Sequence, residues 1–335
     1  MYRRLVLPLL SLAVLALALS CGPQQPAQPA KQPAKPAAQP VAKPAIKPGA
    51  QTAAKPAARP AAQPAAQSAT QPAAPQTESG TFSRFVKTGK LRGRFETAIA
   101  SYEDDKGHSV DLVAAVHIAD KAYYDKLQKR MATYDALLYE LVAAKGTVPE
   151  KGRKSNSIIS QFQRFLKNGL KLEFQLDAID YKKENFVHAD LSPAEFQEKQ
   201  KERGESLVGL MLRSMMQGMK DDKEGKGSKI TIFHVIAGFF AKDQAHYHKF
   251  LFAQELSRLE EMLSSFGDSK GAKSAIIGDR NAACFRVLDE QLAKGKKKIG
   301  VFYGAAHLPD MEARLRKRGF HKKGEIWLTA WDLEK

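Results

Sequence analysis

The sequence predicts an α/β fold, and three observations carry that prediction. Apolar runs typical of buried strands alternate with segments of helical spacing, both early and late in residues 80–335. Two of these strands end in similar short sequences that lead into a helix. The middle of the domain, about residues 150–270, has mainly helical spacing instead. We therefore expect a central mixed or largely parallel sheet flanked by helices, with a mainly helical middle insertion.

Residues 1–80 differ in composition from the rest of the chain. They contain 14 of the 17 prolines, a single acidic residue (Glu78), and no aromatic residue between the first few residues and Phe82. A segment of this composition cannot bury a core. We expect residues 21–79 to form a disordered Pro/Ala/Gln/Lys tether and residues 80–335 to form the folded domain.

The first twenty residues predict an exported protein. Arg3 and Arg4 precede an apolar run over 5–19, which is typical of a signal peptide and short for a membrane span. The run ends at Ser20, Cys21 and Gly22, which resembles a bacterial lipobox. That resemblance implies acylation of Cys21 and anchoring in a membrane of the cell envelope, the outer membrane in a Gram-negative cell. The alternative is an ordinary secreted protein.

Charge and cysteine content exclude several classes of protein. The formal net charge is +17, but part of it lies in the tether, and an exported protein rarely meets nucleic acid. We therefore expect no nucleic-acid partner. Two cysteines are too few for a disulfide framework or a cysteine-rich zinc module.

The start of the domain predicts a hairpin followed by a parallel unit. Strands are expected over 93–104 and 109–117, because a turn-like Asp-Asp-Lys-Gly sequence separates two apolar stretches. A helix over 121–133 and a buried strand over 135–142 follow. Strand, helix and strand in this order indicate a parallel α/β unit.

The remaining elements follow from the same reasoning. Ser192 and Glu195 form a capping box with proline between them, which predicts the start of a helix. The other expected elements are a helix over 155–170, a strand over 186–188, a helix over 278–293, a strand over 298–303, a helix over 309–318 and a strand over 325–331.

Two histidines occupy the same local context. His117 and His307 each follow a hydrophobic strand and small residues, and each precedes an aspartate, Asp120 or Asp310, at the start of a helix. The carboxyl edge of a parallel sheet is where α/β folds bind ligands. Glu140 ends the next strand and can reach the same edge. Two histidines and a carboxylate are a common first shell for a divalent metal, whereas a single histidine at a strand end is usually structural.

The same residues resemble a known family, the TraB/GumN (TIKI-like) proteins. Gly304 to His307 fits the second Gly-x-x-His motif of that family, and Ala114 to His117 fits the first with alanine in place of glycine. Glu140 matches the glutamate strand, and Arg280 with Asn281 matches the Arg-Asn helix start. The resemblance implies the fold shared with erythromycin-esterase-like and haem-binding ChaN-like proteins. It also implies a hydrolase, metal-dependent and protease-like in the animal members.

The resemblance and the residues together suggest roles for the site. His117, His307 and Glu140 would hold Mn, Zn, Fe or Co, or one histidine would act as a general base without metal. Glu140 would ligate the metal or activate water. Arg280 would stabilise an oxyanion or bind a substrate carboxylate, or it would form a structural salt bridge. Supporting residues are expected to be Asp120, His188, Asp190, Asn281 and Gly304.

Three functions remain open at this level. The first is a membrane-anchored hydrolase of peptide or other acyl bonds in the cell envelope. The second is a haem- or metal-binding lipoprotein without turnover. The third is a non-catalytic envelope scaffold or lipid-binding protein, for which loss of His117 and His307 would not matter.

Overall fold

A mixed seven-stranded β-sheet organises the part of the chain that the computed structural model describes, namely residues 82–149, 169–205, 209, 216, 240–268 and 274–334. All of these residues belong to one unit of the chain, and Pro26–Glu78 form another. The leader, the tether, Cys21 and most of the helix expected over 155–170 lie outside the described residues. No helix within the described part is long and apolar enough to cross a bilayer.

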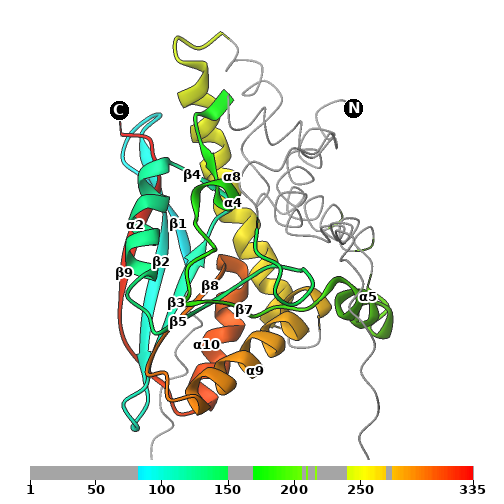
Figure 1. Cartoon of the computed structure of the whole chain (residues 1–335). Coiled ribbons are helices and arrows are strands. Elements are labelled where there is room, and N and C mark those ends of the chain that lie inside the picture. Colours follow the sequence, from blue (N-terminus) through cyan, green and yellow to red (C-terminus); the bar gives the residue numbers. More distant parts are fainter. Residues whose placement is uncertain are drawn as a thin grey trace, which may run out of the picture. The chain divides into compact units, whose positions relative to one another are not determined.

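The main elements follow one another in the order β1, β2, β3, β4, α2, β5, β6, α4, β7, α5, α8, η3, α9, β8, η4, α10 and β9 (Figure 1). The strands are Ser83–Lys87, Gly93–Glu103, Ser109–Ala115, Ile118–Ala119, Ala136–Tyr139, Glu173–Phe174, Phe186–His188, Lys298–Gly304 and His321–Asp332 for β1 to β9. The α-helices are α2 Lys121–Met131, α4 Gln175–Ala178, α5 Pro193–Glu202, α8 Gln244–Asp268, α9 Arg280–Ala293 and α10 Leu308–Lys317. The π-helix η3 covers Ala275–Asp279, and the 3-10 helix η4 covers Ala305–His307.

The predicted fold class is confirmed. The sheet has the order β1-β2-β3-β8-β5-β7, and β9 pairs with β2. Strands β3, β8, β5 and β7 are parallel, while β1, β3 and β9 are antiparallel to β2. The predicted hairpin is present as β2 and β3, and Gly107 in its turn has a φ of 79°, which favours glycine.

The predicted parallel unit is present as β3, α2 and β5, because both strands run parallel to β8. The two strands are not neighbours, since β8 from the end of the chain lies between them. The strand expected over 135–142 is shorter, since β5 ends at Tyr139 and Glu140 already lies beyond it. Within the mainly helical middle, the strand predicted over 186–188 is present as β7, which pairs with β5 in the main sheet.

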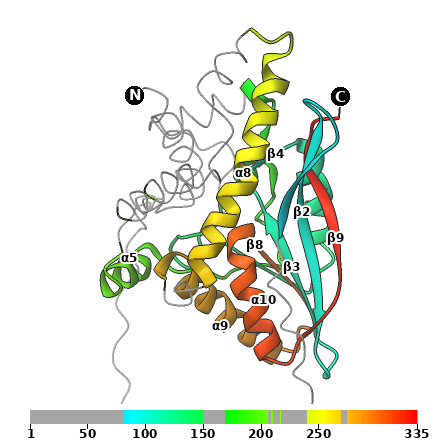
Figure 2. The ribbon, with the colours of Figure 1, turned by 180° about the vertical axis from the view of Figure 1, so that it is seen from behind.

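Alternating side chains give the sheet two buried faces. Phe95 and Ile99 of β2 belong to one core, together with Leu127 of α2. Ala98 and Ala100 of β2 belong to the opposite core, which contains apolar residues of α9 and α10. Helix α8 contributes to the α2 side and also contacts η4 and α10 (Figure 2). The sheet is therefore covered by helices on both faces, as a sheet with parallel strands requires.

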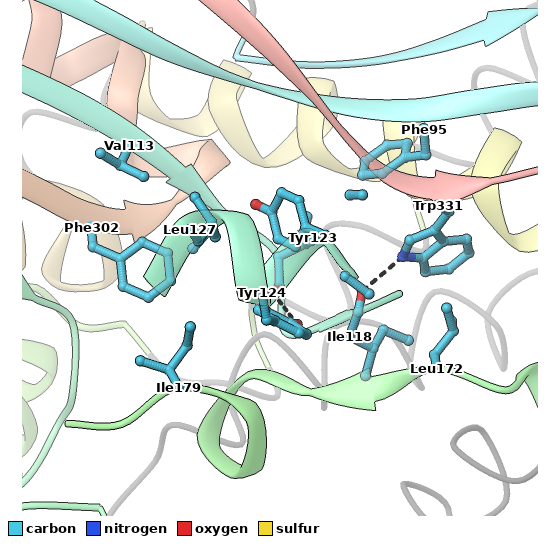
Figure 3. Packing of buried hydrophobic residues seen from close by; sticks show 14 of the residues in the cluster. Phe95, Val113, Ile118, Tyr123, Tyr124, Leu127, Leu172, Ile179, Phe302 and Trp331 are labelled. Carbon is cyan, nitrogen blue, oxygen red and sulfur yellow. Dashed lines mark hydrogen bonds between the residues drawn. The ribbon is translucent and has the colours of Figure 1, made fainter. Parts of the chain in front are cut away.

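The segment that follows β3 is held in place by three aromatic side chains (Figure 3). Tyr123 and Tyr124 donate hydrogen bonds from their hydroxyls to the carbonyls of Ala114 and Val116, at 3.0 and 2.8 Å. The indole nitrogen of Trp331 donates to the carbonyl of Ile118 at 2.7 Å. These bonds satisfy buried carbonyls where the ladder of β3 ends, and they fix the backbone on both sides of His117.

Candidate active site

Each of the four parallel strands places one polar side chain at the same edge of the sheet. His117 follows β3, Glu140 follows β5, Asp190 follows β7 and His307 follows β8. Their carboxyl ends meet at one edge because the strands run in the same direction. Arg280, the first residue of α9, completes the cluster. The site therefore combines segments that lie up to 190 residues apart in the sequence.

Arg280 is the centre of this cluster. Its Nε donates to Asp190 Oδ1 at 3.0 Å, and its Nη2 donates to Asp190 Oδ2 and to Glu140 Oε1, both at 2.6 Å. All three side chains are buried. Two carboxylates and one guanidinium leave one negative charge in excess. Burial lowers the pKa of Arg280, but the two carboxylates dominate and raise it well above its usual value.

Glu140 is fixed at both of its carboxylate oxygens. Oε1 accepts from Arg280, and Oε2 accepts from the backbone N–H of Gly304 at 2.7 Å. Burial alone would raise its pKa, but Arg280, the two histidines and the Gly304 N–H together lower the pKa of Glu140 to about 2. Glu140 is therefore ionised at neutral pH. A Cβ at position 304 would lie 3.3 Å from Oε2, so glycine allows this close approach.

Asn281 fixes the orientation and the tautomer of His307. The Asn281 amide nitrogen donates to the His307 carbonyl at 3.1 Å and to Asp310 Oδ2 at 2.7 Å. Asn281 Oδ1 therefore faces His307 Nδ1, at 2.7 Å, and accepts its proton. In the neutral ring, Nε2 is then the unprotonated nitrogen and carries the lone pair. Asp310 itself lies in the first turn of α10.

The lone pair of His307 lies beside the charged groups. Its Nε2 is 3.5 Å from Arg280 Nη1 and 3.6 Å from Glu140 Oε1. Burial and the Arg280 charge lower the pKa of His307, and they outweigh Glu140, so that the pKa is about 4. The ring is neutral at pH 7. Arg280 Nη1 makes no other hydrogen bond within the described residues, so donor and acceptor face one another with weak contact between them.

His117 lies at the same edge but is less enclosed. It is partly exposed, its carbonyl accepts from the backbone N–H of Gln175 at 2.9 Å, and burial of its ring lowers its pKa. The charges of Glu140 and Arg280 act on this ring, and the Gln175 side chain favours its protonated form. Gln175 Oε1 is buried and has no hydrogen bond of good geometry within the described part of the chain. The sequence did not predict Gln175 as a site residue, because it belongs to no recognisable motif.

The predicted supporting residues divide into two groups. Asp190, Asn281 and Gly304 contact the cluster directly, and Asp190 is the main partner of Arg280. His188 instead bonds through Nε2 to the carbonyl of Leu141. Asp120 accepts from Lys249 Nζ at 2.6 Å and from the backbone N–H of Asp332 at 2.7 Å.

Asp120 also does not cap α2. It occupies the N-cap position, but its side chain makes no capping hydrogen bond, because both carboxylate oxygens face Lys249 and Asp332. The carboxylate instead joins the start of α2 to α8 and to the end of β9, which is a tertiary role.

The donor set does not form a ready metal site. Among the described residues, no group of three or more His, Cys, Asp or Glu side chains is arranged to hold an ion. Both oxygens of Glu140 are engaged by Arg280 and Gly304, and a guanidinium nitrogen lies beside His307 Nε2. A metal shared by His117, His307 and Glu140 would require Arg280 to move. The expectations of a divalent metal and of haem remain predictions.

Comparison with models of protein families, with curated proteins and with solved structures finds no match to this chain.

Proposed function

We propose that the domain is a hydrolase of peptide or other acyl bonds and that it needs no metal for its central step. The observation that supports this most strongly is the pairing of His307 Nε2, the unprotonated nitrogen of a neutral ring, with Arg280 Nη1, a donor 3.5 Å away. Acyl hydrolysis requires a base for the attacking water and a donor for the oxyanion that forms, placed side by side.

The proposed step uses only groups of this chain. His307 Nε2 takes a proton from water as the water oxygen bonds to the carbonyl carbon. Arg280 Nη1 donates to the negative oxygen of the tetrahedral intermediate. The protonated His307 then returns its proton to the leaving group as the acyl bond breaks. Glu140, 3.6 Å from Nε2, stabilises the transient imidazolium, and Asn281 keeps Nδ1 protonated and the ring oriented.

The location of the protein is part of this proposal. The leader and the Ser20-Cys21-Gly22 sequence support export, acylation of Cys21 and anchoring in an envelope membrane. Mass spectrometry of the N-terminal peptide from membrane-extracted protein should find a lipid-modified Cys21, and Cys21→Ser should appear in the soluble fraction. An unmodified Cys21 on soluble wild-type protein would contradict the anchoring.

A generic ester, 4-nitrophenyl acetate, and a mixture of peptides test the activity. We expect the wild-type protein to hydrolyse at least one of them in the presence of a chelator. His307→Gln should reduce the rate by at least about a hundredfold, because the base is lost. His246→Gln is the matched control, since His246 bonds to the carbonyl of Leu91 outside the site. Equal rates in wild type and His307→Gln would contradict the proposal.

Metal analysis of the same samples separates this proposal from a second candidate. Asp190 and Glu140 together carry one negative charge more than Arg280 balances, and His117 and His307 are neutral imidazoles. If Arg280 moved aside, these groups would favour a cation at this edge of the sheet. About one Mn, Zn, Fe or Co per chain, with loss of activity on chelation, would support a metallohydrolase instead. A Soret band after addition of haem would support the haem-binding alternative.

A further inference from the structure

Arg280 owes its position to an unusual helix start. The five residues of η3, Ala275–Asp279, form a π-helix, and α9 begins directly after them at Arg280. The Asp279 N–H donates to the Ser274 carbonyl, five residues back, at 3.0 Å. A π-turn holds one residue more than an α-turn and is less favourable, so neighbouring structure has to stabilise it.

Both ends of η3 are held by the segment at the end of α5. At the start of η3, Glu205 Oε2 accepts from Ala275 N at 2.9 Å and from Ser274 Oγ at 3.2 Å. At its end, Arg203 binds Asp279 through two hydrogen bonds, Nε to Oδ2 at 2.6 Å and Nη2 to Oδ1 at 2.8 Å. Two parallel N–H···O bonds of this kind fix direction as well as distance.

Asp279 is the last residue of η3, and its backbone is helical, with φ −73° and ψ −36°. Its side chain binds Arg203 and makes no hydrogen bond to a backbone N–H of α9. Helix α5 therefore contacts this segment at both ends, since Asp190 just before α5 binds Arg280 and Arg203 just after it binds Asp279.

We propose that Arg203 and Glu205 are positioning residues that keep η3 in its π form and so hold Arg280 against Glu140 and His307. If η3 relaxed to an α-helix, Arg280 would turn by about 100° around the helix axis relative to Ser274, which is the angle per residue of an α-helix. Its guanidinium would then leave Glu140 and His307. This inference concerns the position of Arg280 and does not depend on which reaction the site performs.

The Arg280 Nε proton reports this position directly. It is buried in a hydrogen bond to Asp190 Oδ1, so its NMR signal should exchange slowly with solvent in the full-length protein. Arg280→Lys identifies the signal. In Arg203→Gln we expect its exchange to become up to about fivefold faster, because a partly exposed ion pair contributes up to about this factor to a local opening.

A matched control distinguishes positioning from general loosening. Lys121→Gln removes the ion pair of Lys121 with Asp125 at 2.7 Å on α2, a helix that packs mainly against α4 and β9. Exchange of the Arg280 proton should be unchanged in that variant. The charge-reversed pair, Arg203→Asp with Asp279→Arg, should restore slow exchange and also serves if Arg203→Gln does not fold. The proposal would be overturned if the Arg280 Nε proton of Arg203→Gln exchanged at the wild-type rate. It would also be overturned if exchange of the β8 amides became faster by the same factor as exchange of this proton.

Discussion

Arg280 shows at the scale of a residue how strongly this site depends on charge balance. Its guanidinium is the partner of two buried carboxylates, Glu140 and Asp190. A buried charge that loses its partner is far more costly than the pair itself is stabilising. The same residue therefore determines both the stability of the domain and the chemistry of the site, and these effects can be separated by experiment.

We expect Arg280→Gln to lower the free energy of unfolding by about 3–5 kcal/mol, because it leaves two buried carboxylates without a cation. Adding Asp190→Asn and Glu140→Gln should recover a large part of this loss. Urea unfolding of the single and triple variants measures both values. If the triple variant is as unstable as the single one, unpaired charge is not the reason.

His307 should make the domain less stable in acid. Its pKa is about 4 in the folded protein, below the value of about 6.5 of an unfolded histidine. Between these values the unfolded chain binds a proton that the folded chain does not. The free energy of unfolding should therefore fall by roughly 3 kcal/mol as the pH falls from 6.5 to 4.

His307→Gln should lose this part of the pH dependence, and urea unfolding at several pH values measures it. A smaller dependence of the free energy of unfolding on pH should remain in this variant, because the pKa of His117 is lowered as well. Below about pH 4.5 a further loss is expected from Glu140, whose pKa is lowered to about 2. An unchanged slope in His307→Gln between pH 6.5 and 4 would contradict the low pKa.

Strand β8 is the element on which the site depends most. It is the central parallel strand, it pairs with β3 and β5, and it ends at Gly304 beside Glu140. Gly300 within it faces Tyr134, whose ring atoms lie 2.6 Å from an added Cβ, and Leu137 at 2.7 Å. Such distances are too short for an alanine side chain without movement of these neighbours.

Gly300→Ala should therefore destabilise the domain by about 1–3 kcal/mol, the usual cost of overpacking a core. Gly324→Ala in β9 is the matched control, because nothing lies within 4 Å of a Cβ at that position. We expect that variant to be close to neutral. Thermal unfolding of both variants is the measurement, and equal destabilisation of the two would show that close packing at β8 is not the cause.

The whole molecule should fold without its first 79 residues. Their composition cannot bury a core, whereas the described domain begins at Phe82, which is buried and accepts a hydrogen bond from Ala98 N at 2.9 Å. A chain of residues 80–335 should unfold within roughly 2 °C of the full-length protein. A clearly lower midpoint would show that the leader or tether stabilises the domain.

The local order of the chain could be predicted because it depends on neighbours in sequence. The hairpin of β2 and β3, the capping box at Ser192, and the strand and helix around His307 all follow from periodicity and turn residues. Strand ends also predicted that His117, Glu140 and His307 share one edge of the sheet. These features need no knowledge of distant parts of the chain.

Only the tertiary structure decided which strands are neighbours and which charged side chains pair with one another. No local pattern shows that β8 separates β3 from β5, that Asp120 binds Lys249, or that Arg203 binds Asp279. A charged side chain pairs with the partner that packing brings within reach, and for buried charges such as Arg280 and Asp190 an unpaired state would cost several kcal/mol. The sequence by itself therefore determined which residues gather at the edge of the sheet. The three-dimensional packing determined that Arg280 joins Glu140, Asp190 and His307 at that edge.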